Sequence, residues 1–106
     1  SVKLDQIISL SSRQLTLSLS NLKVKIIHAN AFQDLNDVLG YLNLNQNNLE
    51  SLNYSVFDKL TNLIELVLNK NNLKELSYQS FRNLFKLKLL DLNSNEIIFL
   101  EDDCFN

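Results

Sequence analysis

The sequence has no proline, one glycine and one cysteine. Gly40 is the sole glycine, which excludes a glycine-rich phosphate-binding loop. Cys104 has no second cysteine to pair with, so no disulfide can form within the chain, and we expect a structural thiol. His28 is the sole histidine. One histidine and one cysteine are too few for a typical metal site and make a Ser-His or Cys-His catalytic site difficult to form. We therefore expect no catalytic residue, metal or cofactor.

Long apolar runs and clustered positive charge are also lacking. No run approaches the roughly 20 residues of a membrane-spanning helix, and the start of the chain has no signal-peptide pattern. The net charge is −2, and the lysines are scattered along the chain. We therefore expect no nucleic-acid partner and no membrane contact by this segment.

Leucine and asparagine are abundant instead, at 24 and 16 of the 106 residues. An ordinary globular domain uses glycine and proline in its turns, and this chain has almost none. Asparagine tolerates left-handed turn conformations and bonds its own backbone. The composition therefore indicates one short turn that is used repeatedly.

The repetition has a period of 24 residues. Residues 39–62 and 63–86 are two full copies, 87–106 stop at position 20, and 14–38 are one residue longer. The apolar columns are position 4 (Leu17, Leu42, Leu66, Leu90), position 6 (Leu19, Leu44, Leu68, Leu92), position 11 (Val24, Leu49, Leu73, Ile97), position 14 (Ile27, Leu52, Leu76, Leu100), position 19 (Phe32, Phe57, Phe81, Phe105) and position 22 (Leu35, Leu60, Leu84). Chance does not align this many columns.

The columns predict a coil. Leucines at positions 4 and 6 lie on one side of a short strand, and positions 3, 5 and 7 lie on the other. The chain turns after position 8, and the later apolar columns return to the same interior. One coil cannot bury these residues alone, whereas stacked coils can, with their strands paired in a parallel sheet.

Two columns have more specific expected roles. Position 9 holds asparagine in three copies and Leu22 in the first. An amide there can bond inward-pointing backbone groups, so we predict a ladder rather than surface turn asparagines. The ladder residues are Asn47, Asn71 and Asn95. The phenylalanines of position 19 predict a spine on the outer side of the coil, made of Phe32, Phe57, Phe81 and Phe105.

These columns match LxxLxLxxNxLxxLxxxxFxxLxx, so residues 14–106 resemble the leucine-rich repeat family in its 24-residue class. The resemblance implies an α/β repeat solenoid with a parallel sheet on the concave face and an irregular or short helical convex side. Residues 1–13 fit either a degenerate repeat or the remnant of an N-terminal cap. Because the chain ends in mid-repeat, we expect it to be a piece of a longer solenoid.

Family resemblance also guides the functional expectation. Residues 55–66 (SVFDKLTNLIEL) resemble variable lymphocyte receptors, whereas the asparagine and isoleucine content resembles Toll-type or insect immune receptors. The resemblance implies a non-catalytic recognition module of an extracellular or cell-surface receptor. Its partner would be a protein or other macromolecule, and a homodimer of the parent protein stays open. The alternatives are a spacer or assembly segment of a larger repeat protein and a cytoplasmic scaffold.

In this family the concave strand face is the usual binding surface. The coil does not need positions 3, 5, 7 and 8 for packing, so their side chains are free to bind. The expected ligand-binding residues are Tyr41, Asn43, Glu65, Val67, Leu89 and Asp91. Tyr41, Val67 and Leu89 stand out because an exposed strand face does not need them, and tyrosine is a favoured interface anchor. The alternative is that they are ordinary scattered apolar surface residues.

Two features fall on the convex side. Asn53-Tyr54-Ser55 is an acceptor pattern for N-glycosylation, and position 15 should be exposed, so Asn53 is a candidate glycosylation site. Tyr54 and Tyr78 share position 16, where we expect them to stack over the phenylalanine spine rather than to bind a partner.

Overall fold

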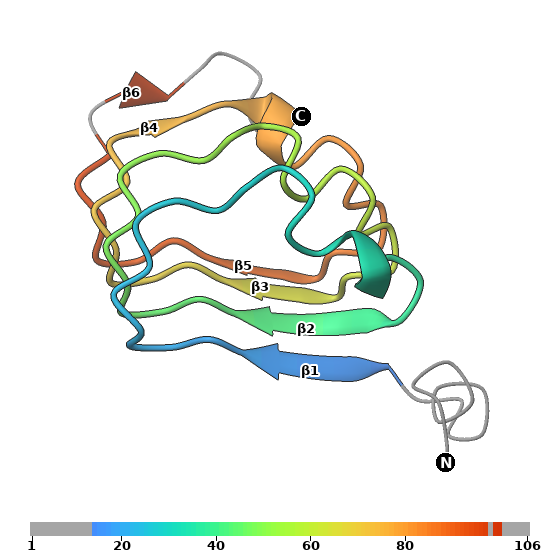
Figure 1. Ribbon diagram of the computed structural model, residues 1–106. Helices are drawn as coiled ribbons and strands as arrows, with labels where there is room; N and C mark the ends of the chain where they lie inside the picture. Colours follow the sequence, from blue (N-terminus) through green and yellow to red (C-terminus); the bar gives the residue numbers. More distant parts are fainter. Residues whose placement is uncertain (1–13, 98, 101–106) are drawn as a thin grey trace.

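The computed structural model describes residues 14–97 and 99–100, with the backbone alone described for Tyr78, Phe99 and Leu100. The chain winds into stacked coils, and each coil contributes one strand to a parallel sheet in the order β1-β2-β3-β5 (Figure 1). The strands are β1 (Leu15–Ser18), β2 (Leu39–Asn43), β3 (Glu65–Val67) and β5 (Leu89–Asp91). The predicted solenoid with one parallel sheet is confirmed.

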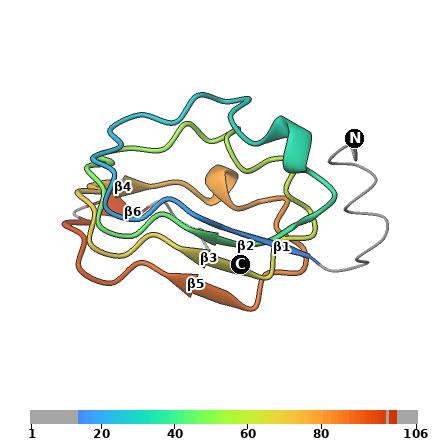
Figure 2. The ribbon, with the colours of Figure 1, turned by 60° about the horizontal axis from the view of Figure 1, so that its bottom comes forward.

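The return path of each coil is mostly irregular. Among the described residues, the first coil has a short 3-10 helix, η1 (Gln33–Leu35), and the third coil has another, η2 (Tyr78–Ser80). A second pair of parallel strands, β4 (Glu75–Leu76) and β6 (Phe99–Leu100), lies across the coils from the main sheet (Figures 1 and 2). The short helices and the small second sheet fit the expected convex side.

The leucine columns form the core between these two sides. Leu17, Leu42, Leu66 and Leu90 are successive partners across the sheet, as the repeat alignment predicts. Leu42 and Leu66 are 1% and 0% exposed, and the leucines at positions 6 and 11 of the two inner coils, Leu44, Leu68, Leu49 and Leu73, are 0% exposed. In contrast, Leu17 of the first coil is partly buried. Burial therefore depends on having a coil on either side.

The turn that follows each strand has a left-handed residue at position 8. The φ angles are 56° at Asn21, 54° at Gln46, 57° at Lys70 and 58° at Ser94. The expectation that asparagine supplies the left-handed conformation is therefore wrong for three of the four coils described. Backbone bonds between coils explain the geometry: Gln46 N–H donates to Asn69 O at 3.1 Å and Lys70 N–H to Asn93 O at 3.0 Å. The parallel hydrogen-bond ladder continues through the turn.

Gly40 allows the first two coils to approach closely. The register of β1 against β2 shifts between Leu15 and Thr16. A Cβ atom on Gly40 would lie 2.6 Å from Gln14 Oε1 and 2.7 Å from Gln14 Cβ, distances that real Cβ atoms do not tolerate. The sole glycine of the chain therefore serves a close contact between coils, since no positive φ requires it.

Candidate binding surface on the strand face

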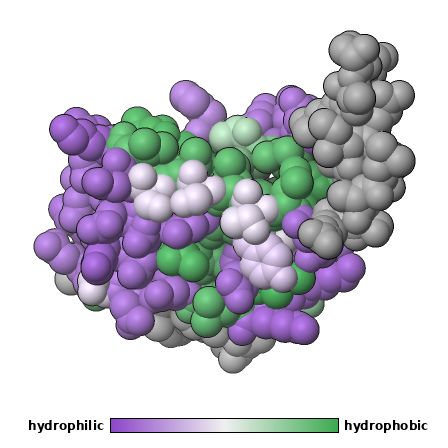
Figure 3. All heavy atoms as spheres, turned by 90° about the horizontal axis from the view of Figure 1, so that it is seen from below, coloured by the Kyte–Doolittle hydropathy of each residue, from purple (hydrophilic) through white to green (hydrophobic). Residues whose placement is uncertain are grey.

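The predicted ligand-binding residues form two adjacent rows on the outer face of the main sheet. Position 3 places Tyr41 beside Glu65 and Glu65 beside Leu89, and position 5 does the same for Asn43, Val67 and Asp91. Figure 3 looks onto this face and shows hydrophobic and weakly polar residues across the middle, with hydrophilic ones at the left, where the strands end. The structure thus brings all six residues together, and we call this surface the strand face.

The strand face is shallow and partly apolar. Leu89 is 46% exposed, and the other five residues are half-buried. A hollow of about 180 Å³ lies over β2 and β3, lined by Thr16, Tyr41, Asn43, Glu65 and Val67 together with Leu42. Pockets for drug-sized ligands typically enclose about 300–1,000 Å³. The surface therefore suits a macromolecular partner better than an enclosed small molecule.

Two residues of the strand face also hold their own turns. Asn43 Oδ1 accepts a hydrogen bond from Asn45 N–H at 3.0 Å, and Asp91 Oδ1 accepts one from Asn93 N–H at 3.0 Å. These are Asx turns, in which the side chain satisfies a backbone donor two residues later. The sequence analysis did not predict these Asx turns. Their signal in the sequence is an asparagine or aspartate two positions before a residue of the turn. Substitution of Asn43 or Asp91 would therefore disturb the turn as well as the surface.

The asparagines of position 9 bond two coils at once. The Asn71 amide is 5% exposed and donates through Nδ2 to Leu44 O at 3.0 Å and to Leu68 O at 3.1 Å, while Oδ1 accepts from Leu49 N–H at 3.2 Å. Asn95 repeats the pattern one coil later, with Leu68 O, Leu92 O and Leu73 N–H as partners at 3.0 Å each. Each amide therefore ties a coil to the one before it.

Asn47 reaches the first coil in the same way. Its Nδ2 donates to Leu19 O at 2.9 Å, and its Oδ1 accepts from Leu22 N–H and Val24 N–H at 3.0 Å each. Leu22, which stands where the other coils have asparagine, is 57% exposed. The amides thus fix the turns at the carboxyl ends of the strands, and with them the position of the strand face.

Aromatic packing supports the opposite side of the coils. The rings of Phe32 and Phe57 stack with centroids 6.4 Å apart and planes 12° apart. Phe81 is partly buried and packs against the same core. Phe105 and Cys104 lie outside the described residues, as do residues 1–13 with their expected repeat or cap. The stacked pair joins the first two coils where no strand pairing does so.

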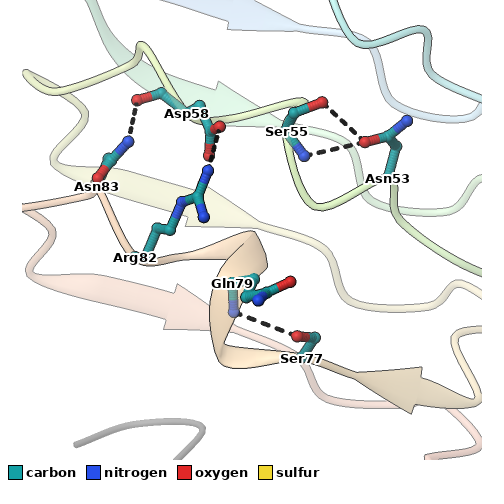
Figure 4. Close-up of polar contacts among 7 residues, drawn as sticks. All are labelled: Asn53, Ser55, Asp58, Ser77, Gln79, Arg82 and Asn83. Carbon is teal, nitrogen blue, oxygen red and sulfur yellow. Dashed lines mark hydrogen bonds and ion pairs between the residues drawn. The ribbon is translucent and has the colours of Figure 1, made fainter.

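The convex side carries the candidate glycosylation site. Asn53 is exposed, and its Oδ1 accepts hydrogen bonds from Ser55 Oγ at 2.8 Å and from Ser55 N–H at 3.0 Å (Figure 4). Tyr54 is 52% exposed. Its expected stacking on Tyr78 lies outside the side chains that the structure describes. The Asn53 Nδ2 atom is the group that a glycan would be joined to, and it projects from an exposed turn.

A polar network links the next two coils on this side. Arg82 pairs with Asp58, with 2.9 Å between Nη2 and Oδ2, and Asn83 Nδ2 donates to Asp58 O at 2.9 Å (Figure 4). Both Arg82 and Asp58 retain solvent contact, at 43% and 20% exposure of their side chains. An ion pair of this kind contributes about 0–1 kcal/mol, so we assign it a supporting role between coils.

The first coil ends in an apolar hollow of about 340 Å³. It is lined by the core columns of that coil, among them Leu17, Leu19, Val24, Ile27, Phe32 and Leu35. His28, exposed as position 15 predicts, lies at its rim. The same columns are buried in the inner coils, so the sequence gives no sign that this coil holds a hollow among the described residues.

The described part of the chain holds neither a candidate metal cluster nor a membrane-spanning helix. In residues 14–97 and 99–100, no group of three or more His, Cys, Asp or Glu side chains could hold a metal ion. No helix in the same part of the chain is long and apolar enough to cross a bilayer.

Comparison with known proteins agrees with the repeat columns. The leucine rich repeat family model matches residues 37–97, more than half of the chain. A solved structure described as the leucine-rich repeat domain of APL1B superimposes with a TM-score of 0.61 at 21% sequence identity. The match covers 90% of this chain and 36% of that one, so this chain spans about a third of it. No curated protein sequence matches.

Leucine-rich repeat domains generally bind proteins and are generally non-catalytic. The likeness to the APL1B domain, at this identity, concerns the fold. The family model covers the three coils that carry the asparagine amides, and the parallel sheet joins these coils to the first one. This chain belongs to the leucine-rich repeat family.

Proposed function

We propose that this chain is a non-catalytic recognition segment of an extracellular receptor of the immune type, and that it binds a protein or other macromolecule through the strand face. The single observation that carries the binding role is the position of Tyr41, Val67 and Leu89. They lie together on the outer face of a sheet whose other face buries every leucine it holds in the inner coils. Packing does not require apolar side chains there.

The rigidity of the sheet supports the same role. Asn43 and Asp91 hold their turns, and Asn47 and Asn71 join the coils beneath them. A surface that is already ordered loses little conformational entropy when it binds. Aromatic and aliphatic anchors on such a surface are the residues that dominate affinity in protein interfaces. The strand face therefore offers a preformed platform with a small apolar centre.

The binding role is tested with a variant that carries Tyr41→Ala, Val67→Ser and Leu89→Ser. Affinity for the partner purified with the native protein is measured by biolayer interferometry. We expect a loss of at least about 30-fold, which corresponds to roughly 2 kcal/mol from central anchors. Circular dichroism and the melting midpoint show that the variant remains folded.

A matched control removes three exposed apolar side chains elsewhere. Ile26, Tyr54 and Phe85 are 74%, 52% and 76% exposed, and none of them is on the strand face. A variant with Ile26→Ser, Tyr54→Ala and Phe85→Ser should keep its affinity within about twofold, a change of roughly 0.4 kcal/mol. Equal losses in the two variants, or a loss confined to the control, would refute the strand face as the binding surface.

Asn53 supports the extracellular location and provides its test. The asparagine is exposed, it belongs to the acceptor pattern Asn-Tyr-Ser, and Ser55 donates to its Oδ1, which leaves Nδ2 unbonded among the described residues. The intact mass of the protein from its native source should fall after peptide N-glycosidase treatment, and the modified residue should be Asn53. A mass that does not change on treatment would remove this support for an extracellular receptor.

A further inference from the structure

The hollow on the strand face contains one carboxylate that the fold does not use. Tyr41 and Glu65 are direct partners across β2 and β3, and Val67 follows two residues later on the same face. Side chains at partner positions of adjacent strands are separated by about 4.8 Å. The phenol ring, the carboxylate and the valine methyl groups therefore line a single depression.

Glu65 differs from the other acceptors of the strand face. Asn43 Oδ1 and Asp91 Oδ1 each accept a backbone N–H, as described above. The Glu65 carboxylate makes no hydrogen bond or ion pair within residues 14–97, and the ion pair recorded there, Arg82 with Asp58, is on the convex side. Glu65 is also half-buried. When a bound molecule covers this surface, a carboxylate without a partner becomes unfavourable, and a cation supplied by that molecule relieves it.

The surroundings of Glu65 favour one kind of cation. A guanidinium group donates two parallel hydrogen bonds to a carboxylate and also stacks on an aromatic ring. Tyr41 supplies such a ring beside Glu65, and Val67 supplies an apolar wall for the methylene stem of a long side chain. An ammonium group would use the charge but neither the planar hydrogen-bond pair nor the stacking.

From these contacts we infer that the hollow of Tyr41, Glu65 and Val67 receives an arginine side chain of the protein partner. The inference rests on the proposed binding role of the strand face and specifies the chemistry of the partner at its centre. Arginine and tyrosine are enriched at the energetic centres of protein interfaces, and an arginine on the partner would meet Glu65 as the apolar anchors make contact.

The inference is tested with N-acetyl-arginine amide as the probe and N-acetyl-citrulline amide as its neutral counterpart of the same shape. Each is titrated into ¹⁵N-labelled protein, and amide chemical shifts are followed. The arginine probe should cause saturable shifts at Tyr41, Glu65 and Val67 with a dissociation constant on the order of millimolar, and the citrulline probe should not.

Glu65→Gln keeps the shape of the side chain and removes its charge, so it should abolish the saturable shifts. Glu50→Gln is the matched control, since it removes a carboxylate from an exposed position off the strand face. That variant should bind the arginine probe within about twofold of the original protein. Equal shifts from both probes, no saturation, or unchanged binding by Glu65→Gln would each overturn the inference.

The two proposals fail in different ways. If the partner needs Tyr41, Val67 and Leu89 while the arginine probe does not bind, the arginine site is wrong and the strand face remains the binding surface. If the partner binds equally well without those three residues, the proposed function itself is wrong, whatever the probe does.

Discussion

The inner coils and the first coil have the same leucine columns but different cores. Leu39, Leu44 and Leu49 of the first inner coil are 0% exposed, whereas Leu17, Leu19 and Val24 of the first coil are partly buried around an apolar hollow. Residue type alone does not determine burial, because each coil covers the core of its neighbour. The comparison shows that stability in this chain comes from contacts between neighbours, as in other repeat proteins.

Among the substitutions that test this comparison, we expect the largest loss of stability at Phe57. Its side chain is 1% exposed and stacks on Phe32 of the first coil, so Phe57→Ala leaves a cavity between two coils. We expect a loss of about 3–5 kcal/mol in the free energy of unfolding, measured by urea denaturation. Phe85→Ala is the control, because that ring is 76% exposed, and it should change the value by about 0.5 kcal/mol or less. Similar losses in both variants would contradict the coil packing.

Leu66 and Leu17 test the comparison within a single column. Both occupy position 4, but Leu66 is 0% exposed and Leu17 is partly buried. Leu66→Ala should cost about 2–5 kcal/mol, and Leu17→Ala about 1–2 kcal/mol because less apolar area leaves water. The free energies of unfolding of the two variants are measured side by side. If Leu17→Ala were as destabilising as Leu66→Ala, the first coil would be as well covered as the inner ones.

The next effect in size separates two adjacent asparagines. Asn71 is buried and bonds Leu44 O, Leu68 O and Leu49 N–H, whereas Asn72 is exposed. Asn71→Ala leaves the buried Leu49 N–H without its acceptor and removes one of the donors to Leu44 O and to Leu68 O, so we expect a loss of about 1–3 kcal/mol. Asn72→Ala should stay within about 0.5 kcal/mol of the original protein. An unchanged melting midpoint for Asn71→Ala would show that the amide ladder does not stabilise the coils.

The smallest effect concerns the left-handed turn. Lys70 has a φ of 57°, a conformation that glycine adopts without strain. Lys70→Gly should therefore stabilise the protein by about 0.5–1 kcal/mol, seen as a higher urea midpoint. Lys74→Gly is the matched control, because Lys74 has no positive φ, and it should lower the midpoint. A lower midpoint for Lys70→Gly would mean that the turn is not strained.

The repeat columns predicted the sheet well because their spacing is a direct consequence of side-chain direction. Leu42 pairs with Leu66 and Tyr41 with Glu65, as the alignment requires. The left-handed turn could not be predicted, since Asn21, Gln46, Lys70 and Ser94 share no chemistry. For Asn21, Gln46 and Lys70 the conformation accompanies a backbone hydrogen bond to the next coil, which only the assembled structure contains.

The candidate site was predictable in part for the same reason. That six residues share the strand face follows from the period of a strand, and the register brings them into two rows. The depression between Tyr41 and Glu65 and the Asx turns of Asn43 and Asp91 depend on neighbouring coils and on rotamers, which the sequence does not specify.

The central claim is that the strand face binds and the rest of the coil does not. Carboxylate labelling with carbodiimide and glycine ethyl ester tests it directly, in the protein alone and in complex with the partner purified from the native source. Labelling of Glu65 should fall in the complex, because a group at the centre of an interface is shielded from water and from the reagent. Labelling of Asp34 and Glu50, exposed and off the strand face, should not change. Unchanged labelling of Glu65 with protection of Asp34 or Glu50 would contradict the account.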